Sequence, residues 1–205
     1  MFDPQTVLQS FCRILDQRLQ RAGNDSKFST VSEDTICLYL AFALKQNGFP
    51  ANSIDMEFPH PFDQLKQREN KVDVVASGPS EILWFEVKFE KISLTASGLS
   101  QLIRDFMRTG LIRSGRRFIL YVFPSEANNK SKAAEEIYHW LESSSWPPAG
   151  DALPRCWKVV QSQLSSFPAE IPPKLRLIKF REQVSGLRCY LYEVVGQEGT
   201  ASAVP

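Results

Sequence analysis

The 205-residue sequence predicts an α/β fold in which helices flank a mixed β-sheet. Two apolar segments with helical spacing open the chain, three short segments with strand-like patterns follow, and helix and strand patterns alternate after them. The predicted order is therefore two helices, three strands, a helix, a strand, a helix and two final strands. Because helices occur before, within and after the strand segments, we expect them on both faces of the sheet.

Capping residues and stop signals define the two N-terminal helices. Asp3 is the expected N-cap of the first helix and Pro4 its first helical residue. The second helix is predicted from about Ser32 to Gln46, where Gly48 stops it. Its interior, ICLYLAFAL, is apolar on almost every side, which predicts deep burial.

The remaining elements follow from the spacing of apolar residues. Alternation, or a short apolar run between turn residues, marks each strand, whereas apolar residues three and four apart mark each helix. These patterns place strands at 53–58, 71–76, 81–89, 116–123, 175–180 and 187–195, and helices at about 96–109 and 130–144. The polar segment 59–70 is predicted to be a loop, and 183–186 a turn between the last two strands.

Length and composition restrict the class of protein. A chain of this size can bury its core as a single domain, which we expect over 1–195, with a core at about 30–145, a C-terminal hairpin at 175–195 and a flexible tail at 196–205. The net charge of +1 argues against a polybasic protein, although a nucleic-acid groove needs only local positive charge. Four well-separated cysteines without a CxxC pair indicate no zinc site and favour a reducing, cytoplasmic setting. No apolar run is long enough to predict a membrane span.

The segment WFEVKFEK, residues 84–91, places charged residues inside an apolar strand. Because strand side chains alternate, Glu86 and Lys88 share a face with Trp84, whereas the opposite face is wholly apolar. An amphipathic strand with a solvated outer face is the simpler explanation for this segment taken alone.

The preceding predicted strand, KVDVVA, also carries an acid, Asp73, which can lie beside Glu86. A symmetric antiparallel hairpin centred between Pro79 and Ser80 sets three pairs of residues opposite one another: Asp73 and Glu86, Lys71 and Lys88, and Val75 and Trp84. Like charges directly opposite one another destabilise a sheet by up to about 1 kcal/mol, and a cation between them would remove that cost. Two carboxylates at a partly open site suit Mg²⁺ or Mn²⁺. A lysine on the same side could orient or deprotonate a water, or stabilise charge on a phosphate.

Asp73 followed by Glu86-Val87-Lys88 resembles the PD-(D/E)xK motif of the restriction-endonuclease-like nucleases, with Val72 in place of the proline. The resemblance covers about residues 30–125 and implies a restriction-endonuclease-like three-layer core. Two further positions fit: Glu33 opens the helix before the sheet, and Gln101 lies on the helix after the Glu-x-Lys strand. The implied catalytic residues are Asp73, Glu86, Lys88, Glu33 and Gln101, and the implied metal ligands are Asp73, Glu86, Glu33 and the Val87 carbonyl.

The resemblance implies a Mg²⁺- or Mn²⁺-dependent nuclease that hydrolyses phosphodiester bonds, with DNA as the expected substrate and a homodimer as one arrangement. Four basic residues are candidates for a phosphate-binding groove: Arg68, Lys71, Arg104 and Arg108. Each has a simpler explanation as solvated surface, and Glu33 has one as an acid in a first helical turn. Two alternatives stay open. One is a catalytically inactive module on the same fold that binds nucleic acid or protein, and the other is an unrelated α/β protein whose EVK segment is surface decoration.

Overall fold

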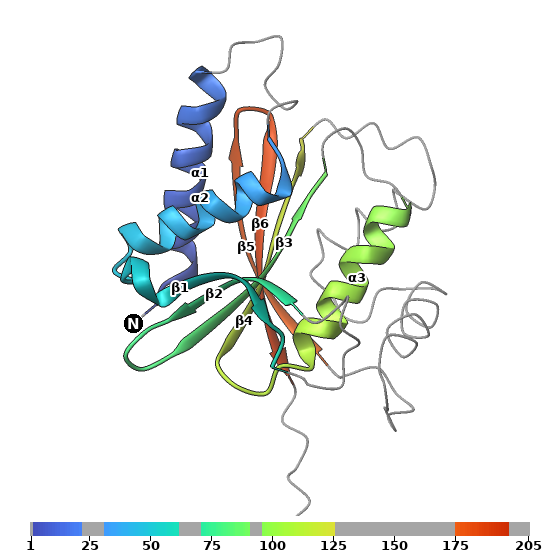
Figure 1. Ribbon diagram of the computed structural model, residues 1–205. Helices are drawn as coiled ribbons and strands as arrows, with labels where there is room; N and C mark the ends of the chain where they lie inside the picture. The colour runs from blue at the N-terminus through green and yellow to red at the C-terminus, as the bar shows by residue number, and fades with distance from the viewer. Residues whose placement is uncertain (1, 22–30, 62–70, 91–95, 126–174, 197–205) are drawn as a thin grey trace, which may run out of the picture.

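The computed structural model describes residues 2–21, 31–61, 71–90, 96–125 and 175–196. Over these ranges the protein is a mixed α/β structure with a six-stranded sheet and three α-helices (Figure 1). The helices are α1 (Pro4–Arg21), α2 (Glu33–Gln46) and α3 (Ala96–Gly110). The strands are β1 (Ile54–Pro59), β2 (Lys71–Ser77), β3 (Ile82–Phe89), β4 (Arg116–Pro124), β5 (Leu175–Val184) and β6 (Leu187–Gly196). A short 3-10 turn, Ala51–Ser53, precedes β1.

These elements confirm the predicted order wherever the chain is described. The predicted helix at 130–144 and most of the predicted loop at 59–70 lie outside the described residues. Asp3 accepts hydrogen bonds from the first-turn amides of Gln5 and Thr6, and the Ser32 hydroxyl accepts one from Thr35 N. Both N-caps therefore stabilise the helices that they were predicted to open.

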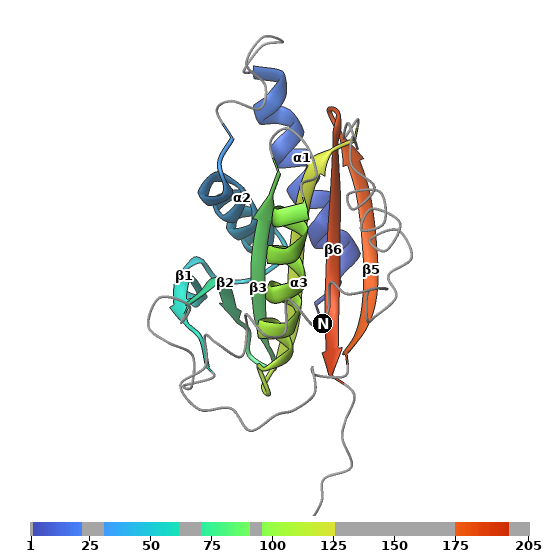
Figure 2. The same cartoon turned by 90° about the vertical axis from the view of Figure 1, so that its right-hand side faces the viewer.

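The strand order is β1-β2-β3-β4-β6-β5, and among the strands of the described residues only the β3–β4 pair is parallel. Helix α3 connects these two parallel strands, and it lies on the opposite face of the sheet from α1 and α2 (Figures 1 and 2). Helices on both faces confirm the predicted three-layer arrangement in outline. No helix in the described ranges is long and apolar enough to cross a membrane.

The main core lies between the sheet and the two N-terminal helices. Phe85, Val87 and Phe89 of β3 point into it, as the alternation of the segment predicted. Cys12 and Cys37 are also buried there and carry free thiols. The opposite face of β3 carries Trp84, which packs with Val72, Val75 and Ile112 in a smaller cluster.

The pairing of β2 with β3 confirms the predicted register in part. The recorded pairs run from Ser77 opposite Ile82 to Val74 opposite Phe85, and they include the predicted Val75–Trp84 pair. The predictions that Asp73 faces Glu86 and Lys71 faces Lys88 as ladder partners are wrong, because the two strands separate beyond Val74. This separation creates the site described below.

The predicted final hairpin forms, but its turn is shorter than the predicted 183–186, because β5 continues to Val184. Val184 pairs with Leu187, so Ser185 and Gly186 make a two-residue turn with φ angles of 46° and 83°. Positive φ at both positions is characteristic of the type I′ turn, whose twist matches that of the flanking strands.

Candidate active site

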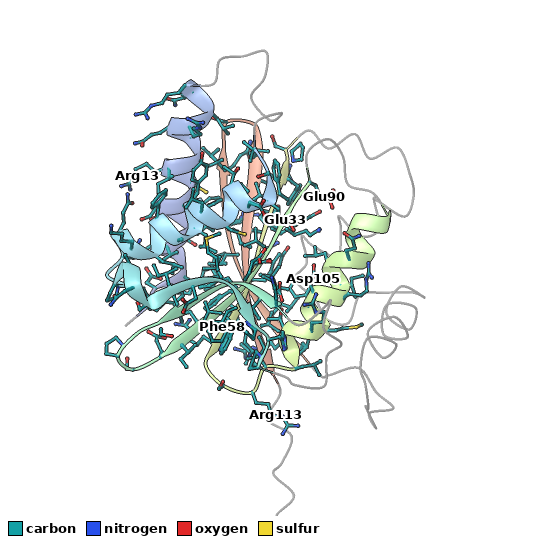
Figure 3. All side chains as sticks on the ribbon, viewed as in Figure 1. Arg13, Glu33, Phe58, Glu90, Asp105 and Arg113 are labelled. Atoms are coloured by element: carbon teal, nitrogen blue, oxygen red, sulfur yellow. The ribbon has the colours of Figure 1, made fainter. Side chains whose placement is uncertain are left out.

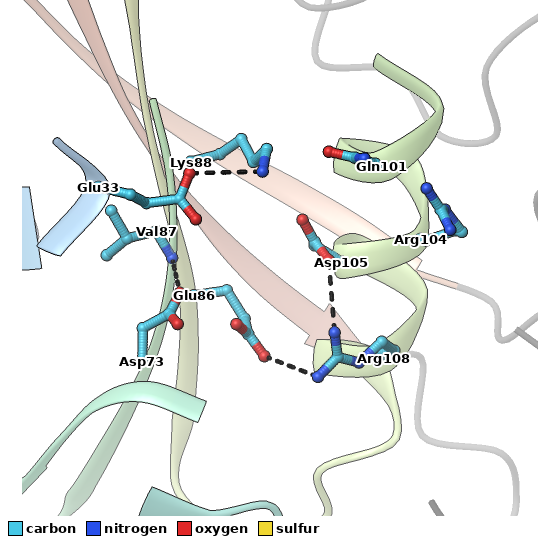
Figure 4. Close-up of a pocket in the computed structure, with 9 residues that line it drawn as sticks. All are labelled: Glu33, Asp73, Glu86, Val87, Lys88, Gln101, Arg104, Asp105 and Arg108. Atoms are coloured by element: carbon cyan, nitrogen blue, oxygen red, sulfur yellow. Dashed lines mark hydrogen bonds and ion pairs between the residues drawn. The ribbon is translucent and has the colours of Figure 1, made fainter. Parts of the chain in front are cut away.

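A polar pocket of about 260 Å³ opens between the C-terminal half of β3 and helix α3 (Figure 4). It is lined by Glu33, Asp73, Glu86, Val87, Lys88, Gln101, Arg104, Asp105 and Arg108. The pocket thus brings together all five residues predicted to be catalytic, although they come from α2, β2, β3 and α3. Figure 3 shows Glu33 and Asp105 near this edge of the sheet, with Glu90 beyond the end of β3.

The separation of β2 from β3 leaves backbone amides of β3 to be satisfied by side chains. Val87 N donates to Asp73 Oδ2 at 2.7 Å, and Phe89 N donates to Glu33 Oε2 at 3.2 Å. Buried amides need partners, so the two carboxylates replace the strand that β3 lacks at this end. Asp73 is also opposite a distortion of β1, where Glu57 has a φ of 53°.

The backbone of Val87 places a further oxygen at the same edge. In an antiparallel ladder, the N–H and C=O of one residue point towards the same neighbouring strand. Because Val87 N–H points to the Asp73 carboxylate, its carbonyl faces the same side of β3. The carbonyl predicted as a metal ligand therefore points to the side of β3 that faces β2 rather than to the side that faces β4.

Asp73 and Glu86 form a close pair of carboxyl groups, of which Asp73 is half-buried and Glu86 is buried. Glu86 is 6% exposed, and its Oε1 is buried without a hydrogen-bond partner. Burial raises the pKa of Glu86 well above its ordinary value, and the neighbouring Asp73 charge raises it further, against the lowering effect of Arg108. Burial also raises the pKa of Asp73, which the hydrogen bond from Val87 N opposes. Burial and mutual repulsion thus disfavour negative charge at this pair, and Arg108 opposes them.

Lys88 lies beside this pair and is held by Glu33. Its Nζ is 3.4 Å from Glu33 Oε2, the oxygen that also accepts from Phe89 N. The Lys88 side chain is 19% exposed, so its charge is screened less than that of a surface lysine. Glu33, which was predicted as a metal ligand, therefore contacts Lys88 and the β3 backbone in this structure.

Arg108 enters the pocket from α3 and contacts acids on both elements. Its guanidinium lies 3.8 Å from Glu86 Oε1 and 3.6 Å from Asp105 Oδ1, and it donates to the Lys71 carbonyl at 3.2 Å. The side chain is only 11% exposed. Arg108 was predicted to line a phosphate-binding groove; it does line this pocket, and it lies beside Glu86 within it.

Asp105 is the lining residue that the sequence prediction did not assign to the site. Burial raises its pKa to about 7, although Arg108 and Lys88 both lower it. The sequence did carry a signal, because Gln101, Asp105 and Arg108 recur at the spacing of one helix face. That spacing alone did not show that this face of α3 is turned towards β3.

The other three predicted basic residues differ in position. Arg104 lines the pocket from α3, as the neutral Gln101 also does. Lys71 does not line it: its exposed Nζ bonds to Glu57 Oε2 at 2.6 Å. Arg68 lies outside the described residues.

The oxygen donors at the pair suit a hard divalent cation. The Asp73 and Glu86 carboxyl groups lie together beside Val87, and Glu86 Oε1 is buried without a hydrogen-bond partner. Among the described residues no group of three or more His, Cys, Asp or Glu side chains forms a ready-made metal cage. Mg²⁺ usually takes one or two carboxylates and keeps several waters, so the smaller set fits its chemistry.

Comparisons of the chain with protein-family models, curated proteins and solved structures found no match.

Proposed function

We propose that this protein is a metal-dependent nuclease that hydrolyses phosphodiester bonds in DNA, built on a restriction-endonuclease-like core. The observation that carries the proposal is the meeting of Asp73 and Glu86 as a buried carboxyl pair beside Lys88 in an open pocket. These are the positions of the PD-(D/E)xK motif, and they come from neighbouring strands. A solvated amphipathic strand would leave Glu86 exposed rather than 6% exposed.

The order of elements around the pocket supports the same proposal. Helix α2 contributes Glu33, strands β2 and β3 contribute the Asp and the Glu-x-Lys, and α3 contributes Gln101. This is the distribution that the motif implies for a restriction-endonuclease-like core.

In the proposed reaction, water adds to the phosphorus and the bond from phosphorus to one ester oxygen breaks. The attacking water gives up a proton to solvent, and the departing oxygen takes one from solvent. Asp73, Glu86 and the Val87 carbonyl would hold Mg²⁺ or Mn²⁺. When bound, that ion offsets the negative charge that builds up on the phosphate.

The remaining polar groups have roles that follow from their contacts. Lys88 lines the same pocket as the carboxyl pair, where its Nζ could hydrogen-bond the attacking water or a phosphate oxygen. Glu33 is a positioning residue, because the oxygen near Lys88 Nζ is also fixed by Phe89 N. Gln101 and Arg104 line the side of the pocket formed by α3 and are placed to contact the phosphate backbone.

A cleavage assay tests this proposal. Wild-type protein is incubated with linear, circular and single-stranded DNA in Mg²⁺, Mn²⁺ or EDTA, beside the variants Asp73→Asn and Lys88→Met. We expect cutting that depends on the metal and falls by about 100-fold or more in each variant. Cutting that persists in both folded variants would contradict the assignment.

One observation favours a second candidate, a catalytically inactive module that binds nucleic acid on the same core. Arg108 is paired with Glu86 and Lys88 with Glu33, so the groups that hydrolysis needs are already engaged with one another. This candidate predicts DNA binding without cleavage under any metal condition, and binding that Asp73→Asn does not weaken.

A further inference from the structure

Arg108 occupies an unusual position for an arginine that lines an open pocket. Its guanidinium is buried to 11% exposure and lies between two acids, Glu86 at 3.8 Å and Asp105 at 3.6 Å (Figure 4). The Lys71 carbonyl accepts a third contact at 3.2 Å. The separations from the acids exceed those of good charge-assisted hydrogen bonds. The guanidinium therefore provides charge near Glu86 without saturating the carboxylate.

His60, which contacts the backbone of Arg108, adds no second positive charge near Glu86. The ring of His60 is buried and hydrogen-bonds the Arg108 backbone, and burial together with the Arg108 charge lowers the pKa of His60 to about 4. His60 is thus neutral near pH 7. Arg108 is the cation closest to Glu86 among the ion pairs recorded for the described residues.

We propose that Arg108 is a built-in counter-ion of Glu86 which a divalent metal displaces, so that metal binding releases its charge towards the substrate phosphate. This inference rests on the proposed function, because it takes Asp73 and Glu86 as the metal-binding pair. Glu86 Oε1, the oxygen nearest Arg108, is the buried oxygen without a hydrogen-bond partner and is therefore the atom with capacity for a new ligand. Asp105 is a second partner that can retain the guanidinium after Glu86 is taken.

If the metal displaces Arg108 from Glu86, replacing Arg108 should change the affinity for metal in the opposite direction from the one expected for a purely structural arginine. A positive charge beside Glu86 repels an incoming dication, and in a partly buried pocket that repulsion is poorly screened. Removing the charge should therefore tighten metal binding, even though it removes a contact of the metal-free protein. An arginine that only braces the pocket would weaken metal binding when replaced, because the ligands would lose their alignment.

The test is a calorimetric titration with Mn²⁺ on full-length wild type, Arg108→Gln, Arg108→Lys and Arg104→Gln. Arg104 is the matched control, because it lies one turn earlier on α3 and lines the same pocket, whereas Arg108 makes the 3.8 Å contact with Glu86 on which the proposal depends. We expect Arg108→Gln to lower the Mn²⁺ Kd by about tenfold or more, while Arg104→Gln changes it by less than about threefold. Arg108→Lys keeps the charge and should stay near wild type.

Each outcome separates this inference from the proposed function. A Kd that is unchanged or higher in Arg108→Gln, with clear binding to wild type, overturns the counter-ion role and leaves the metal site intact. No Mn²⁺ binding to wild type or to Arg108→Gln overturns both. Equal tightening in Arg104→Gln would assign the effect to the total charge of the pocket and also overturn the specific role of Arg108.

A second measurement does not require Arg108→Gln to fold. The guanidinium resonances of wild-type protein labelled at arginine are followed by NMR during a Mg²⁺ titration, with Arg108→Lys used to assign Arg108. We expect the Arg108 signal to shift and to saturate together with the binding isotherm. A signal that stays in place while Mg²⁺ binds would overturn the proposal.

Discussion

At the residue scale, the site depends on two acids that the fold places at an energetic cost. Glu86 is buried beside Asp73, and burial together with the Asp73 charge raises the pKa of Glu86, although Arg108 lowers it. Glu193 on β6 is the opposite case: it accepts from Arg116 Nε at 2.7 Å and from a second guanidinium nitrogen at 3.0 Å. One acid therefore lowers the stability of the metal-free protein, whereas the other contributes to it.

This contrast predicts opposite effects for two matched substitutions. In EDTA near neutral pH, Glu86→Gln should raise the free energy of unfolding by about 1–2 kcal/mol, because a disfavoured charge is removed. Glu193→Gln should lower it by about 1–3 kcal/mol, because hydrogen bonds to a charged partner are lost. Urea denaturation followed by circular dichroism measures both. A destabilised Glu86→Gln would mean that its contact with Arg108 outweighs the repulsion from Asp73.

The residue scale also shows how far the sequence could predict the site. Asp73, Glu86 and Lys88 were found because strand alternation and a turn centre determine which side chains share a face. The inward position of Arg108 was not predictable, because the spacing on α3 defines a face without showing which way that face turns. Asp105 was missed as a site residue for the same reason.

At the element scale, the pocket exists because β3 continues past the end of its pairing with β2. The register of the hairpin could be predicted from its turn, and Val75 opposite Trp84 confirms it. The residue at which β2 and β3 separate could not be predicted. It lies near a distortion of β1 at Glu57, and no sequence pattern indicates that distortion. Asp73 and Glu33 then bond to the exposed amides of β3, so the same acids that form the site also complete the strand.

The turn before β4 lies so close to β3 that a side chain at Gly115 would clash with the β3 backbone. Gly115 has a φ of 72°, and a Cβ there would lie 2.3 Å from the Ile82 carbonyl oxygen and 2.9 Å from Trp84 Nε1. Gly48 has a φ of 95°, but a Cβ there would meet nothing within 4 Å. Both glycines therefore have a positive φ, but only Gly48 has room for a Cβ atom.

Substituting alanine at each position should separate these two costs. Gly48→Ala should lower the free energy of unfolding by about 1 kcal/mol, the cost of left-handed backbone for a residue with a Cβ. Gly115→Ala should lower it by about 2–4 kcal/mol, because a clash with backbone is added. Thermal and urea unfolding of both variants measure the difference. Equal losses would show that the contact between β3 and the turn before β4 is looser than described.

At the scale of the whole molecule, the acids of the pocket couple stability to pH and to metal. Asp105 has a pKa raised to about 7 from an ordinary value of 3.8, and Asp73 and Glu86 are raised in the same direction. Between the unfolded and folded pKa values the folded state holds more protons than the unfolded state. Raising the pH through this window therefore removes stability, and the full contribution is present only below about pH 4.

We therefore expect the metal-free protein to lose stability as the pH rises from about 5 to about 8, by a few kcal/mol at most. Saturating Mn²⁺ should reduce this loss, because a cation bound by the pair favours the ionised carboxylates of the folded state. The double variant Glu86→Gln/Asp105→Asn should show a flatter profile in EDTA. Denaturation midpoints measured across this pH range test the expectation, and a wild-type profile as flat as that of the double variant would contradict it.

The overall architecture was the most predictable level, since six strands and three helices follow from periodicity and capping wherever the chain is described. What periodicity could not supply was the convergence of α2, β2, β3 and α3 on one pocket. That convergence depends on the parallel β3–β4 pair, which places α3 across the sheet face that carries Glu86 and Lys88.

The proposed function depends most on whether the carboxyl pair holds a divalent ion. The most direct measurement is calorimetric titration of Mn²⁺ into wild type, Asp73→Asn and Glu86→Gln, with Glu193→Gln as a control away from the pocket. We predict that wild type and the control each bind a single ion at this site and that both pocket variants lose it. Binding that is absent from wild type, or equal in all four proteins, would contradict the assignment of Asp73 and Glu86 as a metal site.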